Sequence, residues 1–306
     1  MNIILRLLLK IPSLLKIDIQ KDYQLVRRLQ RAVFPDKILP YRFLDKEISA
    51  EDHSHAIPVR IFYPPKERQA GALIFFHGGG WVIGDIGTYT HICVNMAEVT
   101  GRAVYSVDYR LAPEYPFPAG LEDCYRAAAT MIDHPDWLDL EDTSKITLVG
   151  DSAGGNLAAV VSQMFRDQGR EIPAKQILLY PSTYWDHSED SPFESIRAFG
   201  SDYGLTLDNI EDYMTLYEPN VDNRKNPGIA PLLAEDLSDQ PDTLIITAEF
   251  DPLRDEGEAY GEALERAGNR VKVHRILGVA HGFISYPKFA SPVVEAYKEI
   301  NAFIEE

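Results

Sequence analysis

Short apolar runs alternate with helix-forming segments along most of the chain, and this alternation predicts the fold class. Residues 72–80 form a continuous apolar run that ends in glycines, as a central strand buried on both faces would. The other predicted strands are 57–64, 103–110, 146–151, 175–181, 242–248 and 271–277. The predicted helices are 120–132, 153–168, 255–267 and a final helix from about residue 290. This alternation indicates an α/β protein with a mostly parallel, doubly wound sheet of about eight strands.

One long segment, residues 183–228, does not follow this alternation. It is rich in aromatic residues, acids and prolines, and it separates two strong strands. Insertions at the carboxyl edge of a parallel sheet lie where α/β proteins bind ligands. We therefore expect residues 183–228 and the N-terminal residues 1–45 to form a cap over a core made of residues 46–182 and 229–306. A surface excursion without a role is the alternative for the insertion.

The charge of the chain excludes two classes of partner. Its 306 residues carry a net charge of −17, which repels nucleic acid and anionic membrane surfaces. The apolar N-terminal stretch is interrupted by Arg6, Lys10 and Lys16 and broken by Pro12, so it falls short of a membrane span. We expect this stretch to pack against the body as an amphipathic segment, with contact to a membrane surface as the alternative.

The stretch ITLVGDSAGGNLAAV changes from a strand-forming run to a helix-forming run around a single serine. Gly150, Ser152 and Gly154 fit the pattern G-x-S-x-G, which forms a sharp strand-to-helix turn called a nucleophile elbow. Such a turn exposes the serine hydroxyl above the sheet, beside a helix N-terminus that attracts developing negative charge. The pattern therefore predicts Ser152 as a catalytic nucleophile.

A serine nucleophile needs a base and an acid, which in this fold class follow it in the order acid, then histidine. Among eight histidines, His281 in GVAHGF lies between the last predicted strand and the last helix, so it is the predicted base. Asp251 lies just beyond the preceding strand and is the predicted acid, with Asp255 as the alternative. Asp255 and Glu256 also resemble the N-terminal acids of a helix, which the helix dipole favours.

The glycine-rich stretch HGGGW, which begins at His77, predicts a cradle for the substrate oxygen. In this fold the loop after the third strand supplies backbone donors to an oxyanion hole. Gly78 and Gly79 should donate their N–H groups, with Gly79 and Gly80 as the alternative pair. Ala153, directly after the nucleophile, should supply the remaining donor.

With these residues in place, the sequence resembles the hormone-sensitive-lipase-like esterases, the bacterial group IV carboxylesterases. The matching segments are FHGGGW, DYRLAPEYPFPA, GDSAGGNLAA, DPLRDEG and AHGF. The resemblance implies an α/β-hydrolase fold with a two-part helical cap, and ester hydrolysis without a cofactor. It assigns the triad to Ser152, Asp251 and His281. The residues that it treats as structural supports are Tyr109, Arg110, Glu114 and Asp151.

We therefore expect a serine carboxylesterase that hydrolyses short- to medium-chain esters through an acyl-enzyme, with no cofactor and no metal. One alternative is a deacetylase of sugar or arylamide acetyl groups with the same triad. Another is a non-catalytic small-ligand receptor on the same scaffold, although His281 argues against it. The expected partner is a small-molecule ester, without nucleic acid or stable membrane insertion, and a homodimer is left open. Cys93 and Cys124, outside any CxxC pair, suit a reducing compartment, so we expect a cytoplasmic protein.

Overall fold

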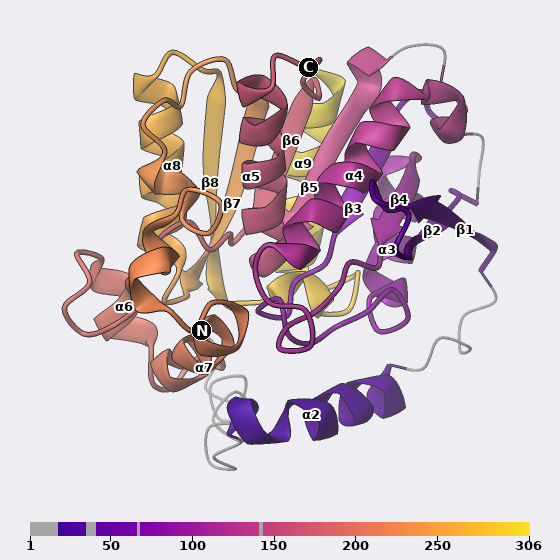
Figure 1. The fold of residues 1–306 in the computed structure, drawn as a ribbon. Helices are drawn as coiled ribbons and strands as arrows, with labels where there is room; N and C mark the ends of the chain where they lie inside the picture. The colour runs from indigo at the N-terminus through magenta and orange to yellow at the C-terminus, as the bar shows by residue number, and fades with distance from the viewer. Residues whose placement is uncertain (1–17, 35–40, 66–67, 141–142) are drawn as a thin grey trace.

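The computed structural model describes residues 18–34, 41–65, 68–140 and 143–306. Within these residues, one eight-stranded sheet runs in the order β1-β2-β4-β3-β5-β6-β7-β8 (Figure 1). The strands are β1 (Phe43–Ser49), β2 (Ala56–Phe62), β3 (Ala72–Phe76), β4 (Ala103–Val107), β5 (Ile146–Asp151), β6 (Lys175–Leu179), β7 (Asp242–Phe250) and β8 (Val271–Ala280). β2 pairs antiparallel with β1 and with β4, and every other neighbouring pair is parallel. The sheet is therefore mostly parallel, as the alternation of strands and helices predicts.

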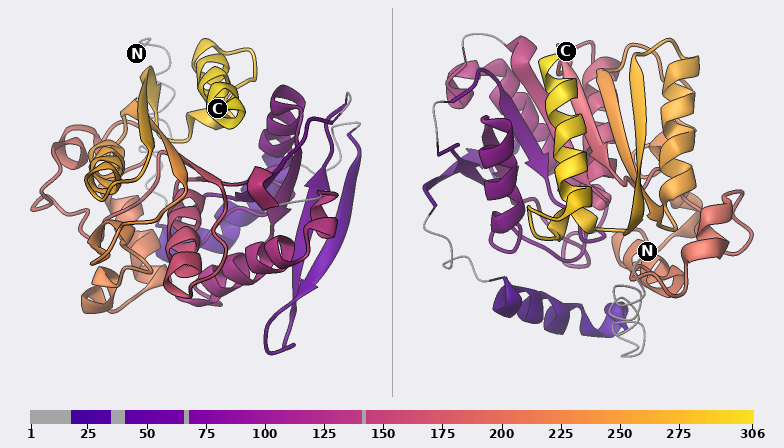
Figure 2. Two further views of the ribbon diagram at one scale, coloured as in Figure 1. Left: turned by 90° about the horizontal axis from the view of Figure 1, so that it is seen from above. Right: turned by 180° about the vertical axis from the view of Figure 1, so that it is seen from behind.

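Helices cover both faces of this sheet. The helices in the described residues are α2 (Ile19–Val33), α3 (Thr90–Thr100), α4 (Ala119–Asp133), α5 (Ala153–Asp167), α6 (Glu194–Phe199), α7 (Leu207–Tyr217), α8 (Arg254–Arg266) and α9 (Ser291–Glu305). Side chains of α3 and α9 share one buried cluster, and those of α4, α5 and α8 share the cluster on the opposite face (Figure 2). This double layer is the doubly wound arrangement expected from the sequence.

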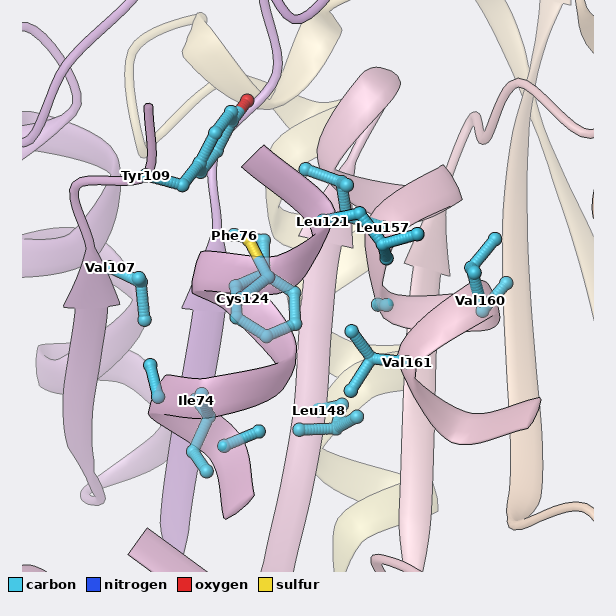
Figure 3. Packing of buried hydrophobic residues seen from close by; sticks show 14 of the residues in the cluster. Ile74, Phe76, Val107, Tyr109, Leu121, Cys124, Leu148, Leu157, Val160 and Val161 are labelled. Carbon is cyan, nitrogen blue, oxygen red and sulfur yellow. The ribbon is translucent and has the colours of Figure 1, made fainter. Parts of the chain in front are cut away.

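The core beneath the β5–α5 turn is tightly closed. Figure 3 shows Cys124 of α4 and Leu157 of α5 over Phe76 of β3 and Leu148 of β5. All four side chains are fully buried, and every residue of β3 and β5 is buried. Burial on both faces explains why these two strands are continuous apolar runs rather than alternating ones. The packing fixes the strand ends from which the site is built.

Two elements of the structure, β1 and α3, are absent from the strands and helices that the sequence pattern predicts. β1 is largely exposed, so it lacks the buried side chains that would mark it as a strand. α3 is mostly buried and ends at Gly101, which adopts a left-handed conformation with φ of +67°. β1 begins at Phe43, so the sheet starts inside residues 1–45, which the sequence assigned to the cap. β3 stops at Phe76, earlier than predicted, where the glycine-rich loop begins.

Three helices gather at one end of the sheet (Figure 1). α6 and α7 lie within residues 183–228, and α2 lies within residues 1–45. The Ile19 N–H donates to Asp212 Oδ2 at 3.1 Å, and this contact joins the start of α2 to α7. The amphipathic stretch expected at the N-terminus falls outside the described residues. Among the described helices, none combines the length and apolar character that crossing a bilayer requires.

Candidate active site

The turn between β5 and α5 holds Ser152 in a backbone conformation that few residues adopt. Its φ is 56° and its ψ is −120°. A Cβ on Gly150 would lie 2.1 Å from the Gly154 carbonyl oxygen, and a Cβ on Gly154 would lie 2.0 Å from the Phe76 carbonyl oxygen. Side chains at these two positions would collide with the backbone, so the flanking glycines permit the turn. The turn places Ser152 at the wall of a cavity.

A chain of hydrogen bonds links three residues that each follow a parallel strand. His281 Nε2 lies 2.8 Å from Ser152 Oγ, and His281 Nδ1 lies 2.7 Å from Asp251 Oδ2. The Asp251 side chain is fully buried, and its other oxygen accepts the Leu253 N–H at 2.9 Å. Ser152 follows β5, Asp251 follows β7 and His281 follows β8. The structure thus brings together the three residues that the sequence predicts as a triad.

The charges around His281 favour its protonated form. Burial alone would lower the pKa of His281, but the facing carboxylate of Asp251, together with the other nearby carboxylates, more than offsets burial and holds the pKa above its ordinary value of 6.5. The Asp151 carboxylate adds to the same effect. An imidazole in this setting can accept a proton from Ser152 and is stabilised while it carries that proton.

The backbone donors beside Ser152 differ from the predicted set in one residue. The Gly78 N–H donates to Asp151 Oδ1 at 2.8 Å, so the structure contradicts Gly78 as an oxyanion donor. The N–H groups of Gly79, Gly80 and Ala153 donate to no acceptor within the described ranges. All three residues line the cavity that contains Ser152. The geometry therefore favours the alternative pair, Gly79 and Gly80, together with Ala153.

Asp151 is the buried carboxylate that anchors the glycine-rich loop. Besides the Gly78 N–H, it accepts the Tyr89 hydroxyl at 3.3 Å, and the Tyr180 hydroxyl lies at 3.5 Å. Burial raises the pKa of Asp151 to about 6, although these donors and His281 favour its charged form. The resemblance treated Asp151 as a structural support, and its hydrogen bonds tie the elbow to the oxyanion loop.

Tyr109 packs against the same glycine-rich loop. Its hydroxyl donates to the His77 carbonyl oxygen at 2.7 Å. The two rings stack with centroids 4.3 Å apart, and both side chains are buried. Burial lowers the pKa of His77, which leaves its imidazole neutral inside the loop. His77 is therefore part of the scaffold and lies outside the hydrogen-bonded triad.

Two ion pairs fix the segment that follows Tyr109. Arg110 pairs with the buried Asp123 at 2.9 Å. Glu114 pairs with Arg27 of α2 at 2.9 Å. Arg110 and Glu114 thus hold the DYRLAPEYPFPA segment to α4 on one side and to the N-terminal helix α2 on the other.

The other acids at the end of β7 and just after it have partners away from His281. Glu249 accepts the Gly278 N–H at 2.7 Å. Asp255 accepts the Ser195 N–H at 2.8 Å. Glu256 is fully buried and accepts the Thr183 N–H at 2.7 Å. Asp255, the alternative acid, therefore joins α8 to α6 in the structure and does not contact the histidine.

The cavity at Ser152 has a volume of about 210 Å³. Its apolar wall consists of Trp81, Leu205, Ile210, Tyr213, Met214 and Leu253. The sequence analysis assigned residues 183–228 to a cap but did not identify Leu205, Ile210 or Met214 as lining residues. Tyr213 and Met214 lie three and four residues after Ile210, so the three residues occupy one face of α7. That spacing is a signal that could have identified them.

A family model described as the alpha/beta hydrolase fold matches residues 73–285. The chain is 37% identical over 301 residues to the esterase LipI of Mycobacterium tuberculosis, which covers 96% of this chain and 91% of that protein. It is 37% identical over 266 residues to an arylesterase of Saccharolobus solfataricus, which covers 87% of this chain and 84% of that protein.

A solved structure has the same architecture over the whole chain. The hyperthermophilic esterase from the archaeon Pyrobaculum calidifontis superimposes with a TM-score of 0.86 and is 35% identical. The superposition covers 100% of this chain and 98% of that chain. Together with the Ser-His-Asp geometry, these similarities agree with the resemblance read from the motifs. The chain belongs to the alpha/beta hydrolase fold family, within its hormone-sensitive-lipase-like carboxylesterases.

Proposed function

We propose that this carboxylesterase works by two-step acyl transfer, with Ser152 as nucleophile, His281 as base and Asp251 as the acid that orients the base. The observation that carries these roles is the continuous hydrogen-bonded chain from the buried Asp251 carboxylate through His281 to the Ser152 hydroxyl. The same arrangement of nucleophile, base and orienting carboxylate recurs in serine hydrolases of unrelated folds.

In the first step, His281 Nε2 takes the proton of Ser152 Oγ while this oxygen bonds to the ester carbonyl carbon. The bond between that carbon and the alcohol oxygen then breaks, and His281 gives its proton to the leaving alcohol. In the second step, water replaces the serine as the nucleophile and His281 serves again as base. The carboxylic acid leaves and Ser152 regains its proton.

The negative charge of each tetrahedral intermediate falls on the former carbonyl oxygen. Gly79, Gly80 and Ala153 carry N–H groups that are free of other acceptors in the described residues and line the same cavity as Ser152. We assign the oxyanion hole to these three donors. Removing a single such donor from a hydrolase costs about 10²- to 10³-fold in kcat.

The volume of the cavity supports short- to medium-chain acyl groups. At about 210 Å³ and with a mainly apolar lining, it is a small cavity suited to a short acyl chain. The wall formed by Ile210, Tyr213 and Met214 then sets a limit, which we place between four and eight acyl carbons. Each methylene buried before that limit contributes about 0.8 kcal/mol.

The test is a panel of p-nitrophenyl esters with acyl chains from C2 to C12, measured with the wild-type protein and with Ser152→Ala. We expect kcat/KM to rise with chain length, to fall past the limit, and to drop by about 10⁴- to 10⁶-fold in Ser152→Ala. Activity of Ser152→Ala within tenfold of the wild type would remove Ser152 from the mechanism. Growth of kcat/KM through C12 would indicate an open lipid-binding groove.

A homodimer stays an open possibility, and a cytoplasmic location stays a prediction from the two cysteines. The unpaired cysteines Cys93 and Cys124 are both buried and free, which suits a reducing compartment. Sedimentation velocity tests the oligomeric state, and fractionation of cells that produce the protein tests its location.

A further inference from the structure

Two cavities meet at His281. The cavity at Ser152, called the inner cavity below, is mainly apolar. A second cavity of about 850 Å³, called the outer cavity, shares Leu205, Tyr213 and His281 with it. The outer cavity is bounded by the start of α2, the residues between α6 and α7, and the first turns of α7, which lie together at one end of the molecule (Figure 1).

The reaction decides which part of an ester enters each cavity. The acyl carbon must reach Ser152 Oγ, and its oxygen must reach the donors Gly79, Gly80 and Ala153, all of which line the inner cavity. The alcohol oxygen must lie near His281 Nε2, because this atom protonates it as it leaves. Of the three triad residues, only His281 lines the outer cavity. The acyl group therefore occupies the inner cavity, and a large alcohol extends past His281 into the outer one.

The walls of the outer cavity differ from those of the inner cavity. The polar side chains that line it are Asp18, Ser201, Thr206, Asp208, Asn209 and Asp212. Its described lining contains no lysine or arginine. Carboxylate and amide oxygens accept hydrogen bonds from hydroxyl groups, and the Tyr213 ring offers a flat apolar surface beside them. Asp18 is paired with Lys21 at 2.6 Å, but Asp208 and Asp212 keep the lining acidic, and on a protein of net charge −17 they repel an anionic ligand.

We propose that the substrate is an ester of a small apolar acyl group with a large, uncharged, hydroxyl-rich alcohol such as a sugar. This inference rests on the proposed function, since it assumes that Ser152 and His281 carry the reaction. The difference in volume supports it, because the cavity for the alcohol is about 850 Å³ and the cavity for the acyl group is about 210 Å³. Apart from His281, the residues that line the outer cavity lie in the two ranges assigned to the cap.

The experiment compares four acetate esters that share one acyl group: ethyl acetate, hexyl acetate, 6-O-acetylglucose and 6-O-acetylgluconate. We expect kcat/KM for acetylglucose to exceed that for hexyl acetate by about tenfold or more, the effect of one or two net hydrogen bonds. The anionic acetylgluconate should be hydrolysed more slowly than acetylglucose, and added salt should narrow that gap.

Ser201→Trp tests the location, because Ser201 is exposed at the rim of the outer cavity. We expect this variant to lower the ratio of kcat/KM for acetylglucose to kcat/KM for ethyl acetate by about tenfold, as the added ring fills the space for the sugar. Ser54→Trp is the matched control, since Ser54 is also exposed but lies in the turn between β1 and β2. The control should leave the ratio unchanged.

The outcomes separate the two proposals. If the wild type hydrolyses none of the four esters, the proposed function itself fails. If ethyl and hexyl acetate are hydrolysed but acetylglucose is no better than hexyl acetate, the assignment of a hydroxyl-rich alcohol is wrong. If acetylglucose is preferred but Ser201→Trp and Ser54→Trp behave alike, the outer cavity is not where the alcohol binds.

Discussion

Replacing Asp151 with asparagine should stabilise the protein at neutral pH. The Asp151 side chain is buried, and its carboxylate faces the Gly78 N–H and the hydroxyls of Tyr89 and Tyr180. Asparagine has nearly the same shape, so its oxygen can still accept the Gly78 N–H and its amide group can donate to a tyrosine hydroxyl. The substitution therefore removes a buried charge while keeping the hydrogen bonds that anchor the loop.

The magnitude follows from the pKa of the carboxyl group. Burial raises the pKa of Asp151 from 3.8 to about 6 in the folded protein. Between about pH 4 and pH 6 the folded state therefore binds a proton more tightly than the unfolded state, and stability falls as the pH rises through this range. At about 1.36 kcal/mol per pKa unit, the charged carboxylate costs the folded state about 3 kcal/mol at pH 7. Asp151→Asn removes this cost, because asparagine carries no charge.

The assay is urea unfolding of the wild type and Asp151→Asn between pH 4 and pH 7.5. We expect the advantage of the variant to grow by about 2 kcal/mol between pH 4 and pH 6 and to level off above pH 7. The acidic limb of kcat/KM should also move to lower pH, because Asp151 helps to raise the pKa of His281. A difference in stability that does not change with pH would refute the reasoning.

Asp255→Asn is the control with the opposite sign. Although burial opposes it, the hydrogen bonds from Arg254 and Ser195 hold the pKa of Asp255 below its ordinary value. A carboxyl group of this kind stabilises the folded state above the unfolded pKa, and the stabilisation is lost as the pH falls. Asp255→Asn should therefore destabilise the protein by an amount that stays nearly constant between pH 4 and pH 7.5 and shrinks only below about pH 4.

Three further predictions concern the mechanism. Asp251→Asn should lower kcat/KM by about 10⁴-fold, whereas Asp255→Asn should cost far less; a larger loss at Asp255 would overturn the choice of acid. The plot of kcat/KM against pH should rise with a midpoint above 6.5, because only neutral His281 accepts the serine proton and its pKa is raised; a midpoint below 6 in a pH titration would contradict this. Tyr213→Ala should remove the wall between the inner and outer cavities and move the optimum in the C2–C12 panel to longer chains; an unchanged optimum would place the limit elsewhere.

The triad can be predicted from the sequence because its geometry follows from the order of the strands. Ser152, Asp251 and His281 each stand directly after a parallel strand, and the carboxyl ends of parallel strands meet at one edge of a sheet. Residues that lie 30 and 129 positions apart are thereby brought within hydrogen-bonding distance. No other histidine satisfies this condition and also follows the serine at a strand end.

The sequence does not show which of the three glycines donate to the oxyanion. Gly78, Gly79 and Gly80 are identical residues in a row, and nothing local in the sequence distinguishes them. The difference comes from Asp151, which lies 73 positions away and occupies the N–H of Gly78 alone. A Cβ on Gly80 would also lie 2.3 Å from the Tyr213 ring, so a cap residue fixes the far end of the loop. Both determinants are tertiary contacts.

The substrate preference is the property that is hardest to predict from the sequence, because the chemistry of the reaction does not constrain the identity of the residues that shape the cavities. In the proposed mechanism, proton transfer requires a serine, a histidine and a carboxylate at Ser152, His281 and Asp251. The α7 residues Ile210, Tyr213 and Met214 need only present a surface of a given shape. The ring of Tyr213 nevertheless borders the inner cavity and the outer cavity and packs on the loop that carries the oxyanion donors. A substitution on this face of α7 can therefore change the acyl limit, the alcohol site and the position of Gly80 together, so the motifs that identify an esterase carry no information about its ester.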